Sequence, residues 1–140
     1  MAAIILATLP SASATLSEFN VRGDAVDAPL AGRAGDALRG RAIVLDRSRG
    51  NCLICHALPS TNEPFQGVIG PSLEGVARRL TAGQIRLRMI DQSRINPATI
   101  MPPFYRIRNL WNVALEYRGM PAFNAQEIED VVAYLATLKE

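Results

Sequence analysis

The sequence Cys52-Leu53-Ile54-Cys55-His56 forms a C-x-x-C-H motif that uses both cysteines and the only histidine of the 140-residue chain. This spacing is the attachment signature of a c-type haem. Two thiols one turn apart can bond to the two vinyl groups on one edge of a porphyrin, and the histidine that follows is then held beneath the iron. The motif therefore predicts one haem c, bound covalently through Cys52 and Cys55, with His56 as the proximal iron ligand.

Other uses of the cysteine pair fit the sequence less well. A thioredoxin-type redox motif needs a β-α-β setting, and no stretch alternates polar and apolar residues well enough to predict a strand. A disulfide between residues 52 and 55 would close a loop so small that its stabilisation is modest. A zinc site needs four protein ligands, which two cysteines and one histidine cannot supply.

The composition is that of a globular chain with the length of one domain. Hydrophobic residues make up 49% and charged residues 20%, which excludes collagen-like, low-complexity and highly charged disordered classes. Fifteen basic residues against 13 acidic ones give a net charge of +2, too small an excess to favour nucleic-acid binding. No stretch reaches the roughly 18 apolar residues that a membrane-spanning helix needs.

The first 14 residues, M-A-A-I-I-L-A-T-L-P-S-A-S-A, have the apolar core and the A-x-A site of a secretory signal peptide, here ending at Ala14. No Lys or Arg precedes Arg22, so either the signal begins upstream of Met1 or this stretch is not a signal. A cleaved signal predicts export to the periplasm, an oxidising compartment. Residues 15–35 are expected to form an extended arm before a domain at 36–140.

Two helices are predicted in the first part of the domain from apolar residues spaced three and four apart. The first follows Asp36 and ends near Gly50. Its predicted apolar face is Ala37, Leu38, Ala42 and Leu45. The second begins at a capping box of Thr81 and Gln84 and closes at Asn96-Pro97. Its predicted apolar face is Ile85, Met89 and Ile90.

The last helix has the clearest pattern. Asn124 is its predicted N-cap, Glu127 stands at the third helical position, and Phe123 can pack against Ile128. The apolar stripe that follows is Ile128, Val131, Val132, Leu135 and Leu138. Residues 57–76 hold too many Pro and Gly for a regular element. The prediction is therefore an all-α fold, in which helices and long loops wrap around one haem.

Methionine is the strongest candidate for the second iron ligand, because the chain has no second histidine. Met89 falls on a predicted apolar helix face, where a core role is expected. Met101 and Met120 are each followed by proline, which favours extended backbone and places both in loops. The pattern alone slightly favours Met120, because it leads straight into the last helix.

Four segments together resemble the SoxX family, the monohaem cytochrome subunits of the SoxAX complexes of thiosulfate-oxidising bacteria. The segments are G-N-C-L-I-C-H-A-L-P (50–59), I-G-P-S-L-E-G-V-A (69–77), T-I-M-P-P-F-Y-R (99–106) and A-Q-E-I-E-D-V-V-A-Y-L (125–135). They follow one another in this order across most of residues 36–139. The resemblance implies a class I cytochrome c fold.

The resemblance also implies roles for two loop residues. In SoxX-like proteins the distal ligand is the Met of the M-P-x-F-Y segment, which here is Met101. Met120 stands where the family more often has Lys, and it remains the alternative ligand. In class I cytochromes c the carbonyl of a loop proline, here Pro71, accepts the second ring N–H of the proximal histidine. The residues alone predict only a turn at Gly70-Pro71.

The function implied by the resemblance is that of an electron-transfer subunit bound to a SoxA-type cytochrome. The SoxAX pair acts as an L-cysteine S-thiosulfotransferase, which oxidatively couples thiosulfate to a cysteine of the SoxY carrier protein. The SoxX haem accepts the electrons and passes them to a downstream cytochrome, so this chain is expected to have no catalytic residue of its own. Two alternatives stay open: a free periplasmic shuttle to a terminal oxidase, ligated by Met120, and a haem enzyme or gas sensor with an open distal position.

Two surface questions are left open by the sequence. Seven Arg and a single acid, Asp91, occur between Arg78 and Arg108. This stretch fits either a solvated helix face or a docking surface, because Arg is favoured at interfaces. Trp111 fits either the core or a patch that faces a partner.

Overall fold

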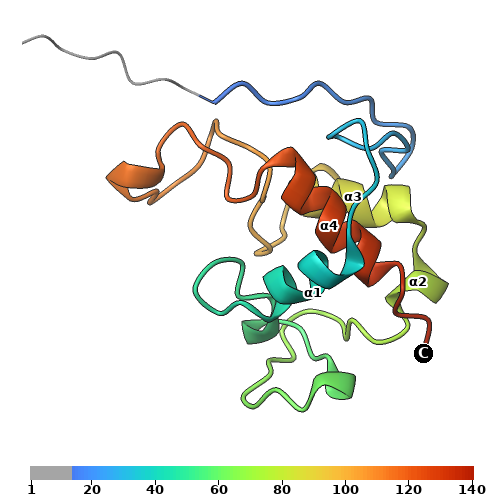
Figure 1. Cartoon of the computed structure of the whole chain (residues 1–140). Coiled ribbons are helices and arrows are strands. Elements are labelled where there is room, and N and C mark those ends of the chain that lie inside the picture. Colours follow the sequence, from blue (N-terminus) through green and yellow to red (C-terminus); the bar gives the residue numbers. More distant parts are fainter. Residues whose placement is uncertain (1–13) are drawn as a thin grey trace, which may run out of the picture.

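Figure 1 shows a computed structural model of the chain, in which residues 14–140 are described. The α-helices are α1 (Ala37–Leu45), α2 (Val76–Arg79), α3 (Ala82–Asp91) and α4 (Ala125–Leu135). Single 3-10 turns are η1 (Cys52–Ile54), η2 (Pro59–Thr61), η3 (Gln92–Arg94) and η4 (Leu115–Tyr117). Residues 14–140 contain no strand, which confirms the all-α prediction, and no helix long and apolar enough to cross a membrane. The predicted signal peptide lies outside the described residues, apart from Ala14.

The centre of the fold is the crossing of α1 and α4 (Figure 1). Gly40 is buried there, and a Cβ at this position would collide with the backbone carbonyl of Asp130. Val44, one turn later, is also buried, whereas Leu38 is 82% exposed. The predicted apolar face of this helix is therefore right only in part. Ala37 and Leu45 are half-buried against the core, but Leu38 and Ala42 are exposed, because the close crossing selects the smallest residue rather than the most apolar ones. The helix also ends at Leu45, short of the predicted end.

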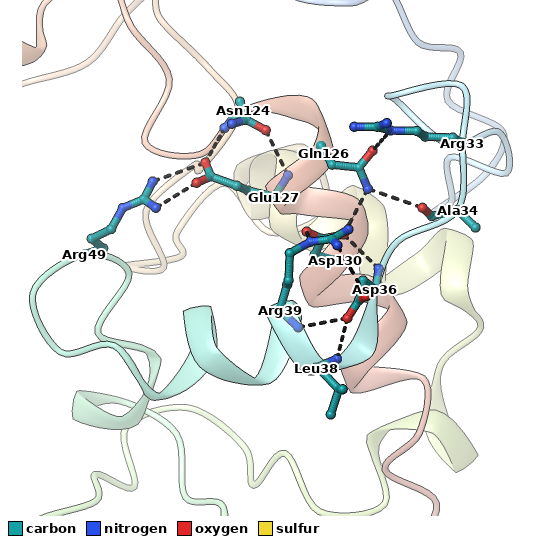
Figure 2. Close-up of polar contacts among 10 residues, drawn as sticks. All are labelled: Arg33, Ala34, Asp36, Leu38, Arg39, Arg49, Asn124, Gln126, Glu127 and Asp130. Carbon is teal, nitrogen blue, oxygen red and sulfur yellow. Dashed lines mark hydrogen bonds and ion pairs between the residues drawn. The ribbon is translucent and has the colours of Figure 1, made fainter.

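Polar contacts fix the start of α1 against α4, as Figure 2 shows. The Asp36 side chain caps α1 by accepting from the N–H groups of Leu38 and Arg39. Asp130 accepts from the Asp36 N–H at 2.8 Å and from Arg39 Nε at 2.7 Å. Burial acts to raise the pKa of Asp130, but the bonds from Arg39, the Asp36 N–H and Gln126 lower it to about 2. Asp130 is thus a carboxylate at neutral pH and ties two elements together.

The other two predicted helices begin where the sequence indicates. Thr81 and Gln84 form the capping box of α3, and Asn124 and Glu127 form that of α4. The predicted apolar residues within both helices are buried, namely Ile85, Met89, Ile90, Ile128, Val131, Val132 and Leu135. α3 ends at Asp91, earlier than predicted, because the Asp91 side chain accepts the Ser93 N–H and starts the turn η3. Leu138 lies beyond the end of α4 and is half-buried.

The N-terminal arm packs along α3 and α4. The Val26 N–H donates to the Gly83 carbonyl at 3.0 Å. Arg86 and Glu129 form a buried two-point ion pair, with both contacts at 2.8 Å. Arg86 also donates to the Val26 carbonyl at 2.6 Å, and Glu129 accepts the Leu30 N–H at 2.9 Å. The arm thus supplies further hydrogen bonds to two charges whose burial is costly when they are incompletely paired.

We expect Gly40→Ala to lower the free energy of unfolding by about 3 kcal/mol or more, because the added methyl group meets helix backbone that cannot rotate away. Leu38→Ala, at an exposed position of the same helix, should change it by less than about 0.5 kcal/mol. Urea unfolding of both variants measures the difference. Equal stabilities would contradict the close crossing of α1 and α4.

Candidate haem site

The C-x-x-C-H motif forms a tight turn after α1. Asn51 has left-handed backbone (φ 46°) and begins the turn η1, and the His56 N–H closes it by donating to the Cys52 carbonyl at 2.9 Å. Leu53, between the cysteines, is fully buried and anchors the turn in the core. The turn therefore places Cys52 and Cys55 one helical turn apart, the arrangement that two thioether bonds to one porphyrin edge require.

Both cysteine thiols are free and half-buried. Burial raises the pKa of the Cys52 thiol to about 11, so this group is a neutral thiol at neutral pH. Redox-active C-x-x-C motifs depend on a thiolate with a lowered pKa. The environment of Cys52 therefore argues against the thioredoxin-type alternative.

The imidazole of His56 is held by the loop at Gly70-Pro71. Its Nδ1 lies 2.7 Å from the Pro71 carbonyl oxygen. A carbonyl only accepts hydrogen bonds, so this contact places the proton on Nδ1 and leaves the Nε2 lone pair for a metal. A Cβ at residue 70 would collide with the imidazole, and the Gly70 N–H donates to the Cys55 carbonyl at 2.7 Å. The Gly-Pro segment thus packs directly on the ring and fixes its orientation.

A pair of stacked phenylalanines connects the two candidate methionine loops. The rings of Phe104 and Phe123 are 8° from parallel with centroids 5.0 Å apart, and the Phe123 N–H donates to the Phe104 carbonyl at 3.0 Å. A Cβ at Gly50 would lie 2.6 Å from the Phe123 ring and 3.6 Å from the Cys52 sulfur, so the stack reaches the attachment turn. Sequence reasoning missed this pair. The signal for it was the repeated M-P-x-F pattern, because each Phe stands three residues after a Met-Pro methionine.

The methionines differ in burial. Met101 is half-buried and packs against the core, and its N–H donates to Thr99 Oγ1 at 3.1 Å. Met120 is 45% exposed. Met89 is buried on α3, as its expected core role requires. The more enclosed position of Met101 favours it over Met120 as an iron ligand.

The residues around the motif fit a haem c. Two free thiols, an imidazole nitrogen with an available lone pair and thioethers in two neighbouring loops are the donors that His/Met cytochromes use. Ile54, Val68 and Ile69 present apolar surface on the turn and on the loop beyond it, where the Gly67 N–H donates to the Leu53 carbonyl at 2.8 Å. Within residues 14–140, no group of three or more His, Cys, Asp or Glu side chains could hold a metal ion.

Comparison with known proteins agrees with this geometry. A Cytochrome c family model matches residues 37–139, and the chain belongs to the cytochrome c family, whose members bind haem c covalently and transfer electrons. The structure is also similar to a chain in the crystal structure of SoxXA from P. pantotrophus, with a TM-score of 0.81 and 34% sequence identity. That match covers 88% of this chain and 96% of the other. The predicted cytochrome c fold and the resemblance to SoxX cytochromes are thereby confirmed. No curated protein matches the chain.

The structure bears on the arginines between residues 78 and 108 and on Trp111, which the sequence left open as core or surface features. Arg86, Arg88 and Arg106 each form an ion pair within the chain, and the pair of Arg86 is buried. Burial excludes Arg86 from a docking surface, whereas Arg88 and Arg106 are partly exposed. Trp111 is 90% exposed, so it is not a core residue.

Gly70→Ala is expected to lower the haem content several-fold, because the new methyl group displaces the His56 ring from its place against Pro71. Ser72→Ala, two residues later at an exposed position, is the matched control. Haem absorbance per mole of purified protein, after expression with a haem-attachment system, measures the effect. An unchanged haem content in Gly70→Ala would show that the loop does not constrain the imidazole.

Proposed function

We propose that this chain is a monohaem electron-transfer subunit, with haem c attached through Cys52 and Cys55 and iron ligated by His56 and Met101. The observation that carries the proposal is the 2.7 Å contact between His56 Nδ1 and the Pro71 carbonyl within the loops of a C-x-x-C-H turn. It selects the tautomer in which Nε2 can ligate iron. A hydrogen bond to the second nitrogen of a ligating histidine also fixes the orientation of the ring and raises its basicity.

In this proposal the residues of the chain position and shield the haem and do not react. The haem supplies an iron centre that takes up and gives up one electron. The Pro71 carbonyl holds the imidazole and makes it a better electron donor. The Met101 thioether raises the reduction potential relative to ligation by a second nitrogen. Leu53 and Phe123, both fully buried, exclude water beneath the attachment turn.

The choice of distal ligand is tested by two substitutions. Met101→Leu should abolish the absorption band of the Met–ferric iron bond, because Leu has no sulfur to donate. Met120→Leu should keep that band, and it is the matched control because it removes a sulfur from the other M-P-x-F segment. The reverse result would assign the ligand to Met120.

We further propose that the chain is exported to the periplasm and works with a SoxA-type cytochrome subunit. The support is the similarity to a SoxXA chain over 88% of this chain at 34% identity. In that role, the coupling of thiosulfate to a cysteine thiol of a SoxY-type carrier forms a sulfur–sulfur bond, with loss of one proton and two electrons. The sulfur chemistry would belong to the partner. A haem held by Cys52, Cys55, His56 and Met101 would supply a one-electron carrier between that partner and a downstream cytochrome.

The partner is tested by purifying the tagged holoprotein from the periplasm of thiosulfate-grown cells. A second haem-stained chain should stay bound to it. A clean monomer with a low-spin spectrum would contradict the subunit role and favour a free electron shuttle. A high-spin spectrum with rapid carbon monoxide binding would instead indicate an open distal site, as in a haem enzyme or a gas sensor.

A further inference from the structure

A charged pair stands directly before the attachment turn. Arg49 donates from Nη1 to Glu127 Oε1 at 2.7 Å and from Nη2 to Glu127 Oε2 at 3.1 Å, so the contact has two points (Figure 2). Glu127 Oε2 also accepts the Asn124 N–H at 2.9 Å, which makes it part of the α4 capping box. The pair therefore joins the loop before the motif to the first turn of α4.

The Arg49 guanidinium also lies over the face of Phe123, 5.3 Å from the ring centroid. That ring is fully buried. A Cβ at Gly50 would lie 2.6 Å from the edge of the ring and 3.6 Å from the Cys52 sulfur, so the ring and the sulfur border the same position. The guanidinium and the cysteine that would carry the haem therefore both lie close to the same aromatic ring. The cation is held on two sides, by a carboxylate and by the electron-rich face of a ring.

The sequence near the motif offers little other charge. No Asp, Glu, Lys or Arg occurs from Gly50 to Asn62, so Arg49 is the charged residue nearest to Cys52 along the chain. The hydrogen bond with Glu127 raises the pKa of Arg49 further, and the pKa of Glu127 is lowered by Arg49 despite the opposing effect of burial. Both groups therefore keep their charges throughout the neutral pH range.

We propose that Arg49 is a positioning residue that raises the reduction potential of the haem, and that Glu127 acts on the potential with the opposite sign. The inference rests on the proposed attachment of haem at Cys52. Reduction adds one electron to the iron, so a fixed positive charge stabilises the ferrous form and a fixed negative charge destabilises it. Glu127 and Phe123 hold the guanidinium in place, so its effect on the haem is that of a fixed charge.

The alternative is a purely structural role, in which the pair only holds the loop against α4. The two roles predict different signs. Loosening the loop exposes the haem edge or weakens the Met–iron bond, and loss of Met ligation lowers the potential whichever partner is removed. An electrostatic role lowers the potential when the cation is removed and raises it when the anion is removed.

The experiment measures the midpoint potential of the holoprotein at low ionic strength in three variants. Arg49→Gln should lower the potential, so that the ratio of reduced to oxidised protein at a fixed solution potential falls roughly two- to fivefold. Glu127→Gln should raise it by a similar factor, and Gln can still fill the third position of the capping box. The double variant should return close to the wild-type potential.

Two further variants serve as controls. Arg49→Lys keeps the charge but loses the two-point contact, and its potential should stay near that of the wild type. Arg39→Gln removes an arginine from the comparable pair with Asp130, at the other end of α1, and should shift the potential much less. If Arg49→Gln fails to retain haem, Glu127→Gln still distinguishes the electrostatic role from the structural one, because loss of structure does not raise the reduction potential.

Three results would overturn the inference: shifts of the same sign in Arg49→Gln and Glu127→Gln, a shift in Arg49→Lys as large as in Arg49→Gln, or an equal effect of Arg39→Gln. A wild-type protein that gives no redox wave would instead overturn the proposed haem attachment. The two failures are therefore distinguishable.

Discussion

The structure depends on the close approach of α1 and α4 at Gly40. α1 leads through a short loop into the attachment turn, and Phe123 stands immediately before the N-cap of α4. Fixing the two helices against each other therefore fixes the Phe123 ring beside Cys52. A side chain at residue 40 would separate these helices, and the loops that carry Met101 and Met120 would then lose the support they share through the phenylalanine stack.

Three carboxylates of α4 each form an ion pair with an arginine from a different segment of the chain. Successive residues of a helix point about 100° apart, so three acids within one turn can reach three directions. The pairs are Glu127 with Arg49, Glu129 with Arg86, and Asp130 with Arg39. They connect α4 to the attachment loop, to α3 and to the start of α1. The ion pairs thus add polar links to the packing of α4 against α1 and α3, and they join α4 to the attachment loop.

The sequence predicts those parts of the molecule that depend on local chemistry. The capping boxes at Thr81 and Asn124 and the apolar stripe of α4 are local patterns, and the structure contains them. The face of α1 was predicted only in part, because apolar spacing does not register a crossing that needs glycine. The stack of Phe104 on Phe123 joins residues far apart in the chain. The repeated M-P-x-F pattern marks both rings, but it does not show that they touch. The C-x-x-C-H motif was recognisable because its chemistry requires residues that are close in sequence.

The buried pair of Arg86 and Glu129 has a consequence for where this domain begins. Two of its hydrogen bonds come from the backbone at Val26 and Leu30, ahead of the first helix. A chain shortened to the start of α1 would leave a guanidinium and a carboxylate in the interior with part of their solvation missing. We therefore expect the arm to unfold together with the helices, so that the smallest piece of this cytochrome that folds begins ahead of α1.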